Sequence, residues 1–306
     1  VSSPMKKYAL MLLCTPSVSA LTLSPLRAAS VGRFSSAPTL LFKGSSKSLK
    51  VPPSQEPPDT DDGSFGKSLR RLQASPARAA MAATYVAALT YVFSGAAPQG
   101  APDETLQIIT ECLDPASYLP TTSVSLFYVI FNSLGVMPAL YAAVLLPGAS
   151  DQAPVPPQTI VGSFAFGYGA LGPYLALRRP RPDPVALSDL GFWGKLTENK
   201  VFAVAMVLSA LSLGSKLFLI EDWASAIATY SQLFDAFGLV NVSSFDLLVL
   251  QLFFFEPARE DMRRRGWWAS PGENPTAEQI VRLSAFCAVP VLGPAAYVLA
   301  RPSLED

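Results

Sequence analysis

The sequence contains no histidine, and this absence excludes several kinds of chemistry. Without an imidazole the chain has no histidine general acid or base, no histidine metal ligand and no histidine axial ligand for haem or chlorophyll. The three cysteines, Cys14, Cys112 and Cys287, are too few and too far apart for a disulfide framework or a metal knuckle. We therefore expect no cofactor, no metal site and no catalytic residue, and we expect that the chain is not an enzyme.

Charged residues are also scarce, at 15% of the chain, whereas half of the residues are hydrophobic and the mean hydropathy is +0.32. This balance is typical of a chain whose partner is the lipid bilayer. The formal net charge is zero. The later arginines sit next to long apolar runs, where they orient membrane spans, so we expect no nucleic-acid partner.

The first 55 residues contain seven lysines and arginines but no aspartate or glutamate. Two lysines follow Met5, an apolar run covers 8–14, and small residues lead to Ala20. This pattern predicts a signal peptide over 1–20. The segment 21–55 is rich in Ser, Ala and Pro and has the composition of a transit peptide.

A signal peptide followed by a transit-peptide-like segment resembles the targeting of proteins to plastids with extra outer membranes, and we favour this interpretation. The alternative is a secreted protein with a Ser- and Pro-rich linker. Residues 56–78 contain Pro57, Pro58 and an acidic run at 59–62. We predict that this segment is a disordered linker.

Five apolar stretches in the rest of the chain are candidates for membrane spans, since a helix needs about 20 apolar residues to cross. The fourth stretch is short for a crossing, and the helix could extend beyond it at either end. No stretch alternates like a barrel strand, so we predict an all-α bundle of about five transmembrane helices within 120–306. The candidate spans are 124–146, 159–177, 201–220, 240–255 and 280–300.

Lysine and arginine are distributed unevenly between the loops that join these spans. The loops 178–200 and 256–282 carry five each, whereas 221–239 carries none. Basic loops face the compartment in which the chain is made. We therefore predict that both basic loops face one side, which is the stroma in a plastid, and that 221–239 and 148–157 face the other.

The segment 79–119 fits this scheme poorly. Its apolar part, 79–93, would be about 22 Å long as a helix, against a hydrocarbon core of about 30 Å. The following residues 95–123 contain no lysine or arginine. We prefer an arrangement in which 79–93 does not cross. In the alternative, 79–93 crosses and 124–146, which contains a glycine and a proline, dips into the membrane and returns.

Two ionisable residues fall inside predicted spans. Lys216 lies near the end of the third span and Asp246 near the start of the fourth, so an antiparallel hairpin would bring them to similar depth. Intramembrane charges are costly and often functional, which makes this pair a candidate for proton- or ion-linked chemistry. The alternative, which we favour, is structural: the pair locks two helices, or Lys216 snorkels while Asp246 binds nearby hydroxyls.

Polar residues elsewhere in the membrane domain have fewer possible roles. Asn132 in the first span could hydrogen-bond a neighbouring helix or a ligand, and helix packing is the commoner use. The densest charge cluster contains Arg259, Arg263, Arg264 and Arg265. We interpret this cluster as a stop-transfer signal and an anchor for anionic lipid. The alternative is a docking surface for a stromal partner.

A short internal similarity links the second and fifth spans. Residues 171–174 (Leu-Gly-Pro-Tyr), followed by Arg178, resemble 292–294 (Leu-Gly-Pro), followed by Tyr297 and Arg301. Because the two predicted orientations are opposite, the similarity could be a remnant of an inverted repeat of the transporter kind. The alternative is chance.

Four segments carry a wider resemblance. They are FNSLGVMPALYAAVLLPG (131–148), FGYGALGPYLALRRP (166–180), SSFDLLVLQLFFFEPAREDMRRRG (243–266) and VPVLGPAAYVLARPSL (289–304). Together they resemble an uncharacterised family of polytopic integral membrane proteins shared by cyanobacteria and plastids. The resemblance implies photosynthetic ancestry and a plastid membrane, and it implies no activity.

We therefore expect a non-enzymatic plastid membrane protein, in the thylakoid rather than the envelope. Its expected role is to assist the assembly, stability or organisation of a photosynthetic membrane complex, which would supply its protein partner. The alternative is a small ion- or proton-linked transporter or channel that uses Asp246 and Lys216.

Overall fold

The computed structural model describes residues 75–114, 125–149, 156–270 and 272–304. The chain separates into residues 1–63 and 64–306, and the first of these units lies wholly outside the described residues. The predicted signal peptide, the transit-peptide-like segment and most of the predicted linker therefore lie outside them too. The description below concerns the second unit.

The described residues are helical, and the one β-bridge among them is an isolated pair, Gln99 and Phe237. The all-α prediction is confirmed for this part of the chain. In chain order the elements are α3 (Pro76–Phe93), α4 (Pro102–Leu113), α5 (Ser125–Leu145), η2 (Leu146–Gly148), α6 (Pro156–Phe166), α7 (Tyr168–Leu177), η3 (Leu187–Asp189), α8 (Phe192–Glu198), α9 (Lys200–Leu217), α10 (Trp223–Ala236), α11 (Gly238–Phe253), α12 (Phe255–Arg264), α13 (Ala277–Ala288) and α14 (Leu292–Ala300).

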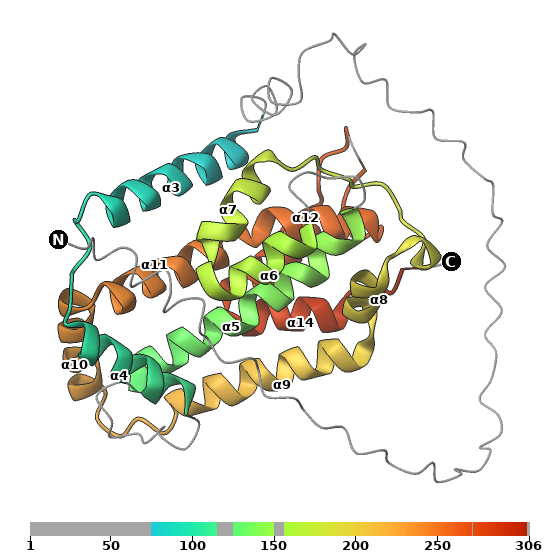
Figure 1. Cartoon of the computed structure of the whole chain (residues 1–306). Helices are drawn as coiled ribbons and strands as arrows, with labels where there is room; N and C mark the ends of the chain where they lie inside the picture. The colour runs from blue at the N-terminus through green and yellow to red at the C-terminus, as the bar shows by residue number, and fades with distance from the viewer. Residues whose placement is uncertain (1–74, 115–124, 150–155, 271, 305–306) are drawn as a thin grey trace, which may run out of the picture. The chain divides into compact units, whose positions relative to one another are not determined.

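Within the described residues, three helical stretches are long and apolar enough to cross a membrane. They are Ser125–Gly148 (α5 with η2), Lys200–Leu217 (α9) and Gly238–Arg264 (α11 with α12), and they correspond to the first, third and fourth predicted spans. The fourth span is longer than predicted because α12 continues it. Helix α5 lies between α9 and α11 and packs on both (Figure 1).

The second and fifth predicted spans are not continuous helices, so the described residues hold three helices of spanning length rather than about five. The second is split at Gly167 into α6 and α7, and the fifth is split at Pro290 and Val291 into α13 and α14. The four pieces have 11, 10, 12 and 9 residues. Each is about 14–18 Å long, too short to cross a core of about 30 Å.

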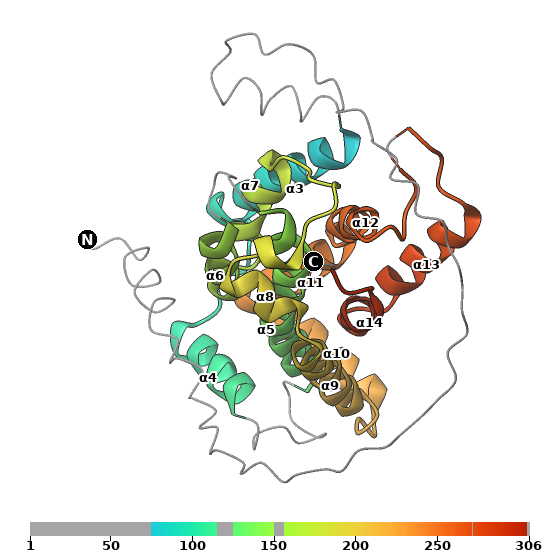
Figure 2. The same ribbon diagram turned by 90° about the vertical axis from the view of Figure 1, so that its right-hand side faces the viewer.

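Each split pair folds back on itself as a helical hairpin. A Cβ on Gly162 of α6 would lie 3.3 Å from the Cβ of Ala170 in α7. In the second pair, the rings of Phe286 in α13 and Tyr297 in α14 are 5.5 Å apart. We call α6 with α7 hairpin 1, and α13 with α14 hairpin 2; both are visible from the side in Figure 2.

One end of the helix bundle, called here the arginine-rich end, joins the two basic loops. The Arg181 N–H donates to Glu260 Oε1 over 2.8 Å, and Arg264 donates to the Arg181 carbonyl over 2.9 Å. The predicted grouping of the two basic loops agrees with this arrangement. Gly148, at the described start of the segment 148–157, also lies here, against Arg264. Hairpin 1 therefore returns to the end from which it begins.

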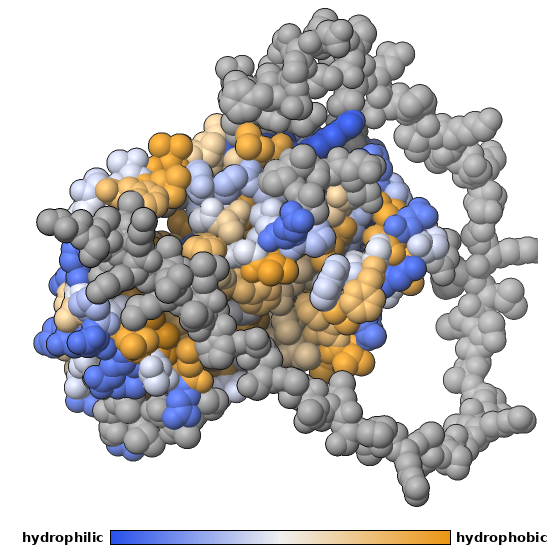
Figure 3. Space-filling view, viewed as in Figure 1, coloured by the Kyte–Doolittle hydropathy of each residue, from blue (hydrophilic) through white to orange (hydrophobic). Residues whose placement is uncertain are grey.

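The opposite end, called here the acidic end, gathers α4, α10 and the segment before α4. The Gly100 N–H donates to the Ala236 carbonyl over 3.1 Å, beside the bridge between Gln99 and Phe237. Helix α4 begins with Asp103 and Glu104, which suit the positive end of the helix dipole. Figure 3 shows hydrophilic residues gathered toward this left-hand end.

Helix α3 runs beside α7 and α11 toward the acidic end. The Tyr168 hydroxyl donates to the Met81 carbonyl over 2.7 Å, and the Tyr91 hydroxyl donates to Asn241 Oδ1 over 2.9 Å. The helix starts at Pro76, within the predicted linker. The part of the chain that turns back on itself is hairpin 1 rather than 124–146. Helix α5 stays continuous through Pro138.

Local capping explains where several helices begin. Asn199 Oδ1 accepts the Val201 N–H over 2.8 Å at the start of α9, and Asp222 Oδ1 accepts the Ser225 N–H over 3.1 Å at the start of α10. Thr276 and Gln279 form a reciprocal capping box at the start of α13. These side chains satisfy amide groups that a helix start leaves without partners.

The core is built around buried tyrosines, and the outer faces of the long helices are apolar. Tyr141 is fully buried, and its hydroxyl donates to the Leu250 carbonyl over 2.6 Å. On the outside, Val201 is 74% exposed, Leu208 61% and Leu252 62%. Figure 3 shows hydrophobic surface across the middle of one face. So much outward apolar surface is characteristic of a membrane or partner contact.

Candidate functional site

Helix α11 places one polar side chain at the break of each hairpin. At hairpin 1, the backbone N–H of Tyr168 donates to Asp246 Oδ1 over 2.7 Å. At hairpin 2, Gln251 Nε2 donates to the Cys287 carbonyl over 2.8 Å, and Gln251 Oε1 accepts the Val291 N–H over 3.1 Å. These bonds satisfy backbone groups that the interrupted helices leave open. We call Asp246 and Gln251 the two clamp residues.

The backbone at each break has a local cause. Gly167 has φ +51°, and a Cβ at this position would overlap the carboxylate of Asp246. In hairpin 2, Pro290 disfavours helical backbone at Val289, which is extended. Val291 then takes φ +59°, which is rare for a β-branched residue. Both hairpins therefore turn at residues that the adjoining α11 side chain supports.

The other end of each hairpin is fixed by an arginine that forms an ion pair with a carboxylate on α12. Arg178, which ends α7, lies 2.6 Å from Glu260, and Arg301, which ends α14, lies 3.0 Å from Asp261. Both hairpins thus run from a clamp residue on α11 to a carboxylate on α12. The segments joined by the internal similarity are equivalent in the fold, but they point in the same direction, so the predicted inverted orientation is wrong.

Asp261 is the centre of a buried ion-pair network. Its side chain is fully buried, it lies 2.8 Å from both Arg264 and Arg265 as well as near Arg301, and it accepts the Tyr297 hydroxyl over 2.8 Å. Arg264 also pairs with Glu260 over 3.2 Å, but Arg265 and Arg301 together on Asp261 leave excess positive charge. A second carboxylate must offset this excess, because an uncompensated buried charge is strongly destabilising.

Glu198, at the end of α8, supplies that second carboxylate. It lies 2.6 Å from Arg265 and 2.7 Å from Arg301. Burial lowers the pKa of Arg265, but the charge of Asp261 and the hydrogen bonds to Glu198 outweigh burial and raise this pKa above its usual value. The network therefore ties α8, α12 and α14 together.

Two of the four arginines in the proposed lipid-anchor or docking cluster are buried. The side chains of Arg264 and Arg265 are 1% and 0% exposed, so they cannot contact lipid headgroups or dock a partner. Arg259 is 34% exposed and pairs with Glu256, and Arg263 is half-buried. The sequence pattern missed this because the carboxylates and arginines that enclose the cluster come from distant segments.

The predicted relation between Lys216 and Asp246 rested on an antiparallel hairpin of α9 and α11. That hairpin is not formed: α10 is inserted between the two helices in the chain, and α5 lies between them in space. Asp246 instead clamps hairpin 1. Lys216 occupies the last turn of α9, where a cation interacts favourably with the helix dipole.

Asn132 joins α5 to α4. Its Nδ2 donates to the Cys112 carbonyl at the end of α4 and to the Tyr128 carbonyl within α5, each over 2.9 Å. These contacts agree with the expected helix-packing use. Burial and the neighbouring Glu111 raise the pKa of the Cys112 thiol to about 12, so this thiol stays protonated and unreactive.

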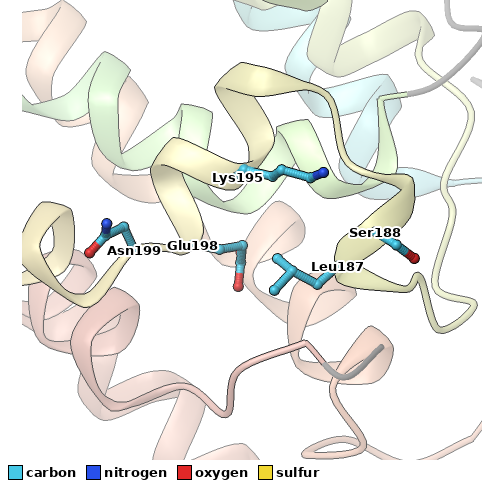
Figure 4. A pocket seen from close by; sticks show the side chains of 5 residues that line it. All are labelled: Leu187, Ser188, Lys195, Glu198 and Asn199. Carbon is cyan, nitrogen blue, oxygen red and sulfur yellow. The ribbon is translucent and has the colours of Figure 1, made fainter.

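Two open hollows lie at the surface. One, of about 400 Å³, is at the arginine-rich end, where Lys195, Glu198 and Asn199 from α8 and its end face η3 (Figure 4). It brings the network member Glu198 within reach of solvent. The other, of about 440 Å³, lies between α5 and α9 and is lined by Asn132, Val136, Leu208, Ser209, Ser212 and Leu213.

Within the described ranges, no group of three or more Cys, Asp or Glu side chains is placed to hold a metal ion. The functional residues that sequence reasoning missed are Gln251, Tyr168 and Glu198. Gln251 was detectable as a polar residue in an apolar run. The Val-Pro step at 289–290 was a further signal, because it predicts an interrupted helix.

No protein-family model, no curated protein and no solved structure matches this chain.

Proposed function

We propose that this chain is an integral membrane protein with three spanning helices and two re-entrant hairpins, and that it acts as a small proton- or ion-linked transporter or channel. The observation that carries the proposal is that both hairpins break beside polar side chains of one spanning helix, Asp246 and Gln251 on α11.

Interrupted helices at membrane depth are tolerated where protein or a water-filled path satisfies their backbone. In transporters, paired interruptions in repeated segments mark the substrate or coupling-ion site. Hairpins 1 and 2 are paired in this sense, because α7 and α14 run in the same direction between α11 and α12. An ionisable side chain at this depth is a functional candidate by default.

Flux in proteoliposomes tests the proposal. The purified chain is reconstituted with a pH-sensitive dye inside, and an imposed potassium diffusion potential drives proton entry. We expect a protein-dependent pH change that Asp246→Asn reduces by at least about tenfold, because the single titratable clamp is lost.

Asp103→Asn, on the exposed face of α4, is the matched control and should leave the flux unchanged. Protein-free liposomes with the same dye and potassium gradient give the background. A flux no larger than this background in the unaltered protein would count against transport. An unchanged flux in Asp246→Asn would remove Asp246 from the mechanism.

A second candidate function is a non-enzymatic role in the assembly, stability or organisation of a photosynthetic membrane complex, in the thylakoid rather than the envelope, with the arginine-rich end toward the stroma. The basic leader and the family resemblance support the location. The exposed apolar face of α9, where Val201, Val204 and Leu208 point outward, supports a partner in the membrane.

For this role we expect the native protein to co-migrate with a photosynthetic complex on native gels of mildly solubilised membranes. Loss of the protein should then lower the amount of that complex. A protein that migrates only as a free monomer, with all complexes unaltered in its absence, contradicts the role.

A further inference from the structure

We infer that the coupling ion is a proton carried by Asp246, and that its binding releases hairpin 1 while hairpin 2 stays fixed. The inference rests on the proposed transport function and names its ion and its moving part. It comes from the difference between the two clamp residues: Asp246 can take up a proton, and the amide of Gln251 cannot.

The surroundings of Asp246 suit a proton better than a metal cation. A cation such as calcium or magnesium needs several oxygen ligands. Asp246 Oδ1 already accepts a backbone N–H, which is a donor, and the N-terminus of α7 presents the positive end of a helix dipole. In the described part of the chain, no cluster of acidic side chains supplies further ligands. A proton needs only one carboxylate oxygen.

The other titratable groups near this part of α11 do not compete for that proton. At the depth of Asp246 they are tyrosine hydroxyls, and a phenol is ordinarily a much weaker acid than a carboxyl group. The nearest ion pair along the chain, Glu256 with Arg259, lies beyond the end of α11. The titratable residues in contact with α11 are Tyr91 on α3, Tyr141 on α5, Tyr168 on α7, Tyr230 on α10 and Cys287 on α13, and Tyr85 on α3 packs on Tyr168.

Protonation weakens the clamp directly. A hydrogen bond to an ionised carboxylate is roughly twice as strong as a bond between neutral groups. When Asp246 becomes a neutral acid, it loses the charge that holds the Tyr168 N–H and faces the start of α7. Asp246 is half-buried, so its carboxylate is not sealed inside the core. Gly167, packed on the carboxylate, leaves no other side chain to hold the break.

Hairpin 2 has a clamp that does not change with pH. The Gln251 amide makes two bonds, to Cys287 and Val291, and neither involves an ionisable atom of the glutamine. The two hairpins share a direction and a distal arginine anchor, so they form an internal comparison within one molecule: one break that responds to protons and one that does not.

Cysteine labelling of the full chain in lipid nanodiscs tests this difference without measuring flux. The reporter for hairpin 1 is Ser163→Cys, whose side chain is 1% exposed, in a chain with its three native cysteines replaced by serine. The reporter for hairpin 2 is native Cys287, with Cys14 and Cys112 replaced. Each maleimide rate is divided by that of the same protein unfolded at the same pH, which removes the titration of the thiol.

We expect the hairpin 1 reporter to label about tenfold faster at about pH 5 than at about pH 9, since protonation removes roughly half of a charge-assisted bond. The Cys287 reporter should not respond. Asp246→Asn should label fast at both pH values. Gln251→Glu should make the Cys287 reporter respond to pH, which tests the same principle even if Asp246→Asn fails to fold.

A hairpin 1 reporter that labels equally at both pH values, or a pH response that survives Asp246→Asn, overturns the inference. A pH-dependent hairpin without proton flux removes transport as the function but leaves the proton-dependent release. Flux that follows an imposed sodium or potassium gradient and is independent of pH retains transport and removes the proton.

Discussion

Gly167→Ala is expected to destabilise the folded chain by about 2–5 kcal/mol, or to prevent its accumulation. An L-residue at this positive φ costs about 1–2 kcal/mol. The new methyl group would also displace the Asp246 carboxylate and leave the Tyr168 N–H without its acceptor, at a cost of about 1–3 kcal/mol. The measurement is the yield of monodisperse protein in mild detergent together with its thermal unfolding midpoint.

Two matched substitutions control for the loss of a glycine. Gly135 in α5 and Gly214 in α9 have no atom within 4 Å of an added Cβ. Gly135→Ala and Gly214→Ala should leave stability unchanged or raise it by about 0.5–1 kcal/mol, because alanine favours helix. If Gly167→Ala behaves like these two, the break of hairpin 1 does not depend on the contact with Asp246.

Asp261→Ala is expected to lower the free energy of unfolding by about 3–5 kcal/mol, because removing one partner leaves buried charges uncompensated. The substitution would leave three buried arginines with fewer carboxylates: Arg264 would keep only Glu260, and Arg265 and Arg301 would share Glu198. It would also remove the acceptor of the Tyr297 hydroxyl. Denaturant unfolding in detergent, followed by tryptophan fluorescence, measures the change.

The control is an exposed ion pair of the same chemistry. Glu278 pairs with Arg282 on α13, and its side chain is 78% exposed. Glu278→Ala should change stability by about 0–1 kcal/mol, as solvent screens such pairs. Equal effects for Asp261→Ala and Glu278→Ala would mean that the buried network does not hold the arginine-rich end together.

The helices of spanning length were predictable because their signal is local. Helices α5, α9 and α11 are continuous apolar runs, and a run of that length has few alternatives to a helix. The grouping of the basic loops also followed from composition. The carboxylates Glu260 and Asp261 stand next to the arginines 263–265 in the sequence. The sequence therefore does not show that they also bind Arg178 and Arg301, which come from distant segments.

The hairpins were not predictable from composition, because an interrupted helix can be as apolar as one of spanning length. What stops hairpin 1 from continuing is a contact between Tyr168 and Asp246, which are 78 positions apart. The role of the clamp residues was not predictable for the same reason. Asp246 was detected as an intramembrane charge, but its partner is a backbone amide, and no residue pattern in the sequence marks a backbone amide as a partner.

The chain order of the clamps and their hairpins sets a sequence of events during synthesis. Hairpin 2 leaves the ribosome after Gln251 and Asp261, so both of its anchors are in place when it emerges. Hairpin 1 leaves before Asp246 and Glu260, and its broken backbone and Arg178 have no acceptor until α11 and α12 have been made. Hairpin 1 can therefore reach its final structure only after the second half of the chain has been made. A nascent protein that ends before α11 contains a hairpin whose backbone amide and arginine have no partners, and such a chain is prone to misfolding.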